Sequence, residues 1–129
     1  LHTNATEENH HLLNAEAFAK MKPGVTIVNT ARGKLIDSDA LLKALESGQV
    51  GAASLDVLEN ENGLYYYDRM GDVIPNTELA ALRAMPNVLL TDHTAFYTYE
   101  AVKSMVLSVL ESASAFAEGL PTRHDVTDR

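Results

Sequence analysis

The sequence of 129 residues contains no cysteine, which excludes a disulfide framework and a thiolate metal site and fits a reducing, cytoplasmic setting. Basic residues are few, since ten Lys and Arg stand against 18 Asp and Glu and the formal net charge is −8 at pH 7. A phosphate-binding surface needs clustered Lys and Arg, so this charge balance argues against a nucleic-acid partner. No apolar run approaches the roughly 20 residues needed to cross a bilayer, and no membrane partner is expected.

Several familiar motifs are also missing. No GxGxxG occurs, so the chain carries no dinucleotide fingerprint of its own. Neither HExxH nor DxDxDG is present, and no metal site is predicted. The opening LHTNATEENHH has no signal-peptide character and no initiator Met. It resembles the end of a strand that started earlier, and we expect the chain to be a segment of a longer protein.

The residues that are present predict a globular α/β domain, because 46% are hydrophobic and 22% are charged. Short runs of strand formers alternate with apolar residues at helical spacing. Such alternation predicts a parallel sheet with right-handed crossovers and helices on both faces. The expected strands are 25–29, 50–55 and 88–91, and the expected helices are 14–21, 39–46 (capped by Asp37 or Ser38), 78–85 (capped by Thr77) and 98–118.

Polar residues follow each predicted strand, at the edge where open α/β sheets keep their active sites. Arg32 follows the first strand, Asp56 and Glu61 the second, and His93 the third. A cation, a carboxylate pair and an imidazole suit chemistry on an anionic carbonyl compound. The alternatives are a surface arginine, solvated carboxylates and a hydrogen-bonded structural histidine.

Other polar and aromatic residues give weaker signals. His10 and His11 lie in a polar opening segment and are expected to be solvated. Residues 57–76 form a long irregular stretch, whose Tyr65-Tyr66-Tyr67 run either packs over a neighbouring surface or simply anchors the loop.

Two long motifs carry a family resemblance. VNTARGKLIDSDALLKALESGQVGAASLDVLENE, followed by MPNVLLTDHTAFYT, resembles the C-terminal half of the NAD-dependent D-2-hydroxyacid dehydrogenases. The closest likeness is to D-lactate dehydrogenases, including the vancomycin-resistance type, and it covers about residues 1–118. The resemblance implies half of a doubly wound, Rossmann-like NAD-binding domain in residues 1–97. It further implies a long helix, 98–118, that returns toward a substrate domain, and a loose tail, 119–129.

The resemblance also implies roles for individual residues. Arg32 would bind the substrate carboxylate and polarise the keto group, and His93 would protonate the carbonyl oxygen. Glu61 would pair with His93 and favour the protonated ring. Phe96 and Tyr97 would lie near the substrate side chain. The residues expected to contact NAD are His2, Thr3, Asn4, Asn9, Thr30, Ala31 and Asp56.

Two positions depart from the family pattern, which usually has Pro where Asn4 and Asp92 stand. Asp92 either adds a negative charge beside His93 or points away from it. The expected function is reduction of pyruvate to D-lactate with NADH, in a homodimer, with the 129-residue chain alone inactive. Larger 2-keto acids such as 2-ketoisocaproate are an alternative, and so is an NAD-binding transcriptional corepressor of this fold.

Overall fold

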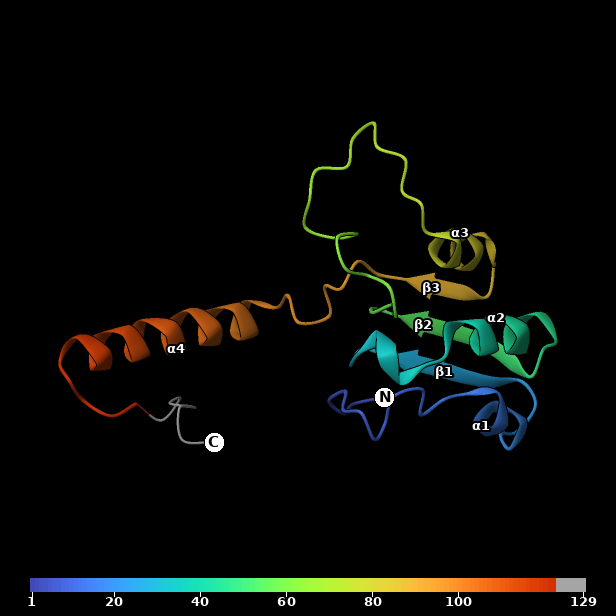
Figure 1. Ribbon diagram of the computed structural model, residues 1–129, viewed down its shortest axis with the longest axis horizontal. Coiled ribbons are helices and arrows are strands. Elements are labelled where there is room, and N and C mark those ends of the chain that lie inside the picture. The colour runs from blue at the N-terminus through green and yellow to red at the C-terminus, as the bar shows by residue number, and fades with distance from the viewer. Residues whose placement is uncertain (123–129) are drawn as a thin grey trace. The chain divides into compact units, whose positions relative to one another are not determined.

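A computed structural model describes residues 1–122, which divide into two units (Figure 1). The first is Leu1–Thr94 and the second begins at Ala95. The sequence-based boundary lies three residues later, after Tyr97. Of the tail predicted to be loose, residues 123–129 lie outside the described residues.

The first unit is built on a parallel sheet with strand order β1-β2-β3. The strands are β1 (Val25–Asn29), β2 (Val50–Leu55) and β3 (Val88–Leu90). Asn29 pairs with Leu55, and Leu55 pairs with Leu90, so the three strands end level with one another. The α/β class with a parallel sheet is confirmed, and the polar residues after each strand start from one edge.

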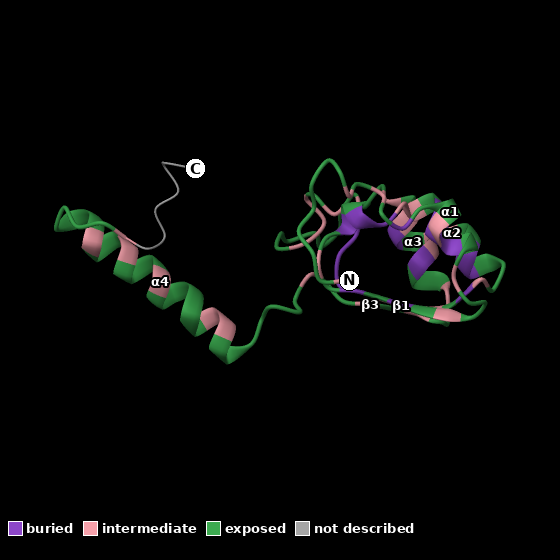
Figure 2. Ribbon diagram, turned by 90° about the horizontal axis from the view of Figure 1, so that it is seen from below, coloured by how far each residue is buried: buried purple, intermediate pink, exposed green. Residues whose placement is uncertain are grey.

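The α-helices of the first unit are α1 (Ala15–Ala19), α2 (Ser38–Glu46) and α3 (Thr77–Ala84), and a short 3-10 helix, η1, spans Gly33–Leu35. All three α-helices cover the same face of the sheet (Figure 2), whereas the sequence predicts helices on both faces. The strand order runs in one direction without a reversal. Right-handed crossovers that progress in one direction place their helices on one side, which explains the difference.

The core lies between these helices and the sheet. Phe18 of α1, Leu41 of α2 and Leu82 of α3 are each exposed by 2% or less. Alternate strand residues point away from this core, as the period-2 geometry of a strand requires. On that opposite face Val28 remains 49% exposed and Leu89 61% exposed.

Side-chain caps set the starts of the helices. Asp37 accepts a hydrogen bond from the Ala40 amide at the start of α2, as one of the two expected caps. The cap of α3 is Asn76, whose side chain accepts from the Leu79 amide, and not Thr77 as predicted. Asn and Thr are both favoured as N-caps, and here they are adjacent in the sequence, so residue type alone does not predict which of the two is the cap.

The second unit contains α4 (Tyr99–Ala117), which begins at the Thr98 cap. None of its residues is buried; Val109 is 67% exposed and Phe116 86% exposed. Across residues 1–122, no helix is both long enough and apolar enough to span a membrane.

Candidate active site

The loop after β1 is shaped by Asn29, which is fully buried at the end of its strand. Its side-chain amide donates to the Arg32 carbonyl at 2.9 Å, and its Oδ1 accepts from the Ala31 amide at 3.1 Å. The side chain therefore fixes residues 30–32 as one turn. Arg32 itself is exposed, and one guanidinium nitrogen donates to the Ala31 carbonyl at 2.7 Å. Its remaining N–H groups can still donate two parallel hydrogen bonds to a carboxylate.

Gly33 brings this loop against the loop that follows β2. A Cβ at position 33 would lie 2.0 Å from the backbone carbonyl carbon of Leu58 and 2.4 Å from the Glu59 amide nitrogen. Only a glycine permits such a close approach of two backbones. The loop carrying Arg32 and the loop leading to Glu61 are thus held against each other through position 33.

Glu61 and His93 form a pair 2.8 Å apart between Oε1 and Nδ1. The other oxygen of Glu61, Oε2, accepts from the Leu58 amide at 2.9 Å. Both side chains are mostly buried, with exposed fractions of 19% for Glu61 and 26% for His93. Because the carboxylate contacts Nδ1, it fixes the ring orientation and turns Nε2 to the opposite side.

The backbone of His93 is left-handed, with φ of 54°, which is uncommon for a residue other than glycine. Contacts on both sides of the residue hold this conformation. The Tyr66 hydroxyl donates to the His93 carbonyl. Asp56, which is 3% exposed, accepts from the Thr91 hydroxyl at 2.5 Å and from the Thr94 amide at 2.9 Å. Asp56 is therefore bonded to both ends of the turn that carries His93.

Tyr65 and Tyr66 of this loop remain neutral phenols near neutral pH. Burial, followed by the negative charges of Asp92 and Glu61, raises the pKa of Tyr65 to about 12. The pKa of Tyr66 is also raised, first by loss of solvent and then by the charges of Asp56 and Glu61. Tyr66 accordingly keeps the proton with which it bonds the His93 carbonyl.

A hollow of about 430 Å³ gathers most of the residues expected to contact NAD; its lining consists of His2, Thr3, Asn4, Ala31 and Arg32. Thr30 is exposed beside it in sequence but is not part of the lining. Asn9 does not line the hollow. Its side chain donates a hydrogen bond to the Asn4 carbonyl at 2.8 Å and accepts one from the Thr6 amide at 2.7 Å. Asn9 thus fixes the shape of the loop that forms one wall.

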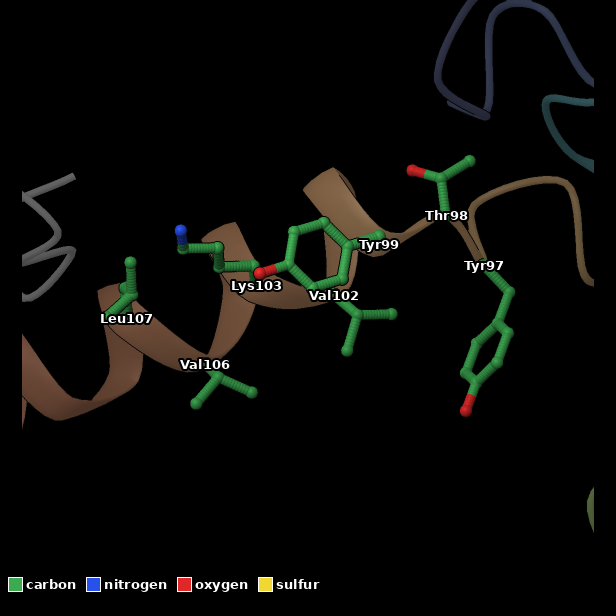
Figure 3. A pocket seen from close by; sticks show the side chains of 7 residues that line it. All are labelled: Tyr97, Thr98, Tyr99, Val102, Lys103, Val106 and Leu107. Carbon is green, nitrogen blue, oxygen red and sulfur yellow. The ribbon is translucent and has the colours of Figure 1, made fainter.

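Phe96 and Tyr97 belong to the second unit, where their rings pack edge to face with centroids 6.0 Å apart. Tyr97 also lines a hollow of about 400 Å³ along the start of α4, where Val102 and Val106 lie on the same side of the helix (Figure 3). Lys103 is the one charged residue of its lining, which offers no acid–base pair. The chemistry is therefore better placed at the strand ends of the first unit.

Asp92, one of the departures from the family pattern, lies 3.6 Å from the guanidinium of Arg83. The sequence left open whether the Asp92 carboxylate lies beside His93 or points away from it. The contact with Arg83 shows that it is directed toward α3.

Several residues that shape the site were not identified from the sequence; they are Asn29, Gly33, Tyr66, Thr91 and Thr94. The first two carried a usable signal, because an Asn that ends an apolar strand and a Gly after Arg mark a tight turn. The others act through contacts with residues more than 25 positions away, which no local pattern reveals.

The residues after the strands include an exposed guanidinium, that of Arg32, and an imidazole in contact with a carboxylate, that of His93 with Glu61. The protein-family model for the NAD-binding domain of the D-isomer specific 2-hydroxyacid dehydrogenases matches residues 1–95.

Individual relatives extend the comparison. The D-lactate dehydrogenase of Escherichia coli is 46% identical over 119 residues, which are 92% of this chain and 36% of that protein. The aromatic 2-oxoacid reductase of Clostridium sporogenes is 44% identical over 116 residues, which are 90% of this chain and 35% of that protein. The crystal structure of TP0037 from Treponema pallidum, a D-lactate dehydrogenase, matches with a TM-score of 0.94 and 40% identity. That match covers 98% of this chain and 38% of the other. The chain thus spans about a third of the length of the relatives it matches.

Proposed function

The chain belongs to the D-isomer specific 2-hydroxyacid dehydrogenases, as part of their NAD-binding domain, and from this premise we propose that a protein carrying it reduces pyruvate to D-lactate. The observation that carries the proposal is the Glu61–His93 pair at the end of the sheet. When bound, NADH supplies the hydride for the carbonyl carbon. The residues of this chain supply the proton, the charge and the orientation.

His93 is proposed as the proton donor to the keto oxygen. Glu61 contacts Nδ1 and orients the ring, so Nε2 is the atom proposed to deliver the proton. Arg32 is proposed to bind the substrate carboxylate through two parallel N–H bonds and to polarise the keto group. Asn29 and Gly33 hold the loop of this arginine in place.

The hollow beside Arg32 fits part of a dinucleotide. It lies after the carboxyl end of β1, where open α/β sheets bind such ligands, and it is lined by polar side chains and backbone. We propose that His2, Thr3, Asn4 and Ala31 contact NAD there, with Thr30 next to them. Asn9 would act indirectly, because it fixes the loop of Asn4.

The choice of 2-keto acid is part of the proposal. One relative is named for D-lactate and another, of nearly equal identity, for aromatic 2-oxo acids. We propose pyruvate, with Phe96 and Tyr97 near the substrate side chain, and a homodimer as the assembly. The 129-residue chain alone is expected to be inactive, since it spans a third of its relatives.

The proposal is tested by NADH oxidation with pyruvate, 2-ketoisocaproate and phenylpyruvate in a purified full-length protein that carries this chain. His93→Gln should lower kcat by about 10²–10⁴-fold, as loss of a general acid does. Arg32→Lys should mainly raise KM, because a lysine cannot form the bidentate contact. Glu61→Gln should lower kcat, whereas Glu8→Gln, which removes an exposed carboxylate elsewhere, should not.

Retention of kcat by His93→Gln to within tenfold of the parent would contradict the assigned role. A faster reaction with phenylpyruvate than with pyruvate would replace the substrate but keep the reaction class. A corepressor is the second candidate class, and NAD-dependent peptide binding without turnover of any of the three acids would favour it.

A further inference from the structure

A second cluster of titratable side chains lies outside the residues assigned to the active site. One nitrogen of His10, one nitrogen of His11 and one carboxylate oxygen of Glu59 lie within 4.8 Å of one another. The His11 Nε2–Glu59 Oε1 distance is 2.5 Å, and the His10 Nε2–Glu59 Oε1 distance is 3.9 Å. The sequence predicts both histidines to be solvated, but the side chain of His11 is only 31% exposed.

The backbone at His11 gives the two imidazoles a shared orientation. Its φ of 52° is left-handed, a conformation that is strained for a residue with a Cβ. The chain turns sharply there, and the rings of His10 and His11 stack with centroids 3.9 Å apart and 26° between their planes. Neighbouring side chains in an extended segment would point to opposite sides.

The loops that carry the cluster are tied together by the backbone. The His11 amide donates to the Lys34 carbonyl at 2.9 Å, which fixes the histidines to the loop after β1. In that same loop Gly33 abuts the backbone of Leu58 and Glu59. Both histidines and the carboxylate are therefore positioned by contacts that do not depend on their own side chains.

Glu59 shares the Ser38 hydroxyl with a second carboxylate, that of Glu78. The Ser38 hydroxyl lies 3.2 Å from Glu59 Oε2 and 2.7 Å from Glu78 Oε1. A hydroxyl has a single proton, so it cannot donate fully to both carboxylates. The second oxygen of Glu78, Oε2, is buried and has no hydrogen-bond partner among residues 1–122. A cation beside Glu59 would offset part of the negative charge of these two neighbouring carboxylates.

We propose that His10, His11 and Glu59 bind a divalent zinc ion. Two imidazoles and one carboxylate form a three-ligand set that zinc accepts, with a fourth position left for water. Imidazole nitrogens disfavour magnesium and calcium, which take oxygen ligands. Tetrahedral zinc with bonds of about 2.0–2.1 Å holds its ligand atoms roughly 3.3 Å apart. The two His–Glu distances, 2.5 and 3.9 Å, bracket that value, and the nitrogen atoms of the two histidines lie within 4.8 Å of each other, so movements of up to about 1.5 Å would complete the site.

The competing explanation is that His11 and Glu59 form a hydrogen bond that only braces the loops. His10 separates the two explanations, because its side chain approaches Glu59 only to 3.9 Å and otherwise stacks on the ring of His11. His10→Gln therefore removes one zinc ligand and leaves the brace intact. His11→Gln and Glu59→Gln would break both.

The experiment is a titration of chelator-treated, purified protein with Co²⁺, followed through the visible absorption of tetrahedral Co²⁺, and then with Zn²⁺ as competitor. The parent should bind Co²⁺ with this spectrum and release it to Zn²⁺. His10→Gln should raise the Kd at least about tenfold with an unchanged free energy of unfolding. His2→Gln, the same change outside the cluster, should leave the Kd unchanged.

Two results would overturn the proposal. One is a parent protein that develops no tetrahedral spectrum, and the other is a His10→Gln variant that binds Co²⁺ as tightly as the parent. Neither result concerns catalysis, because the readout is a spectrum and not turnover.

Discussion

Gly33→Ala is the most informative single perturbation of the proposed active site, since it adds one methyl group where two loops meet. The new Cβ would start 2.0 Å from the carbonyl carbon and oxygen of Leu58, whereas ordinary van der Waals contact begins at 3.4 Å. The neighbouring atoms are backbone and cannot rotate away. Relief of the overlap therefore requires one loop to move by about 1.4 Å.

That displacement would shift both parts of the proposed site. Gly33 directly follows Arg32, and the backbone amide of Leu58, the residue that Gly33 contacts, donates a hydrogen bond to the Glu61 carboxylate. Overpacking of this kind costs about 1–3 kcal/mol of folding free energy. A misplacement of about 1 Å can lower the rate by about 100-fold. We expect the Gly33→Ala variant to fold, to unfold at lower urea concentration, and to lose about 100-fold or more in kcat/KM for pyruvate.

Gly48→Ala is the matched control. An added Cβ at Gly48 has no atom within 4 Å, but φ is +77°, so alanine there is strained without a clash. It should cost roughly 1–2 kcal/mol of stability and leave kcat/KM unchanged. The reasoning would be refuted if Gly33→Ala kept kcat/KM within about threefold of the parent, or if Gly48→Ala lost activity to the same extent.

Three further substitutions test other parts of the first unit. Tyr65→Phe removes a buried hydroxyl without a hydrogen-bond partner among residues 1–122, so urea denaturation should show a gain of about 1 kcal/mol. The pKa of Tyr65 is about 12 in the folded state against an ordinary 10.0, so the unfolded chain loses its phenol proton first and the free energy of unfolding falls as the pH rises from 10 to 12. Tyr65→Phe should show a smaller decrease over this pH range. Asn29→Ala deletes two hydrogen bonds of a buried side chain and should cost about 2–3 kcal/mol, with a higher KM for the 2-keto acid in steady-state assays. Asp37→Ala removes the cap of α2 and should cost about 1 kcal/mol in the same urea assay.

Local sequence patterns were sufficient for the elements of the sheet. The strands at 25–29 and 50–55 have the expected bounds, because a turn-forming glycine, Gly24 or Gly48, lies just before each apolar run and a polar residue, Thr30 or Asp56, follows it. The side on which helices pack is a property of strand order, and strand order is not a local pattern. The missing reversal in β1-β2-β3 is the reason that one face stays uncovered by helices in the first unit.

The convergence of Asp56, Glu61 and His93 at one edge also followed from general rules, since parallel strands present their carboxyl ends together. What could not be predicted is how the turn at His93 is held. The left-handed backbone depends on the Tyr66 hydroxyl, 27 positions away, and on Asp56, which bonds Thr94 across 38 positions. Contacts at such separations form only when the whole unit has folded.

The loop of residues 57–61 connects the two proposals. Glu59 contacts His11 and Glu61 contacts His93, so two carboxylates two residues apart serve different clusters. Gly33 presses on the backbone between Leu58 and Glu59, directly before both. Three variants should therefore separate the sites: His10→Gln should weaken metal binding alone, Glu61→Gln should lower turnover alone, and Gly33→Ala should impair both. If Gly33→Ala impaired one and spared the other, the loop would not move as a unit, and the two clusters would have independent supports.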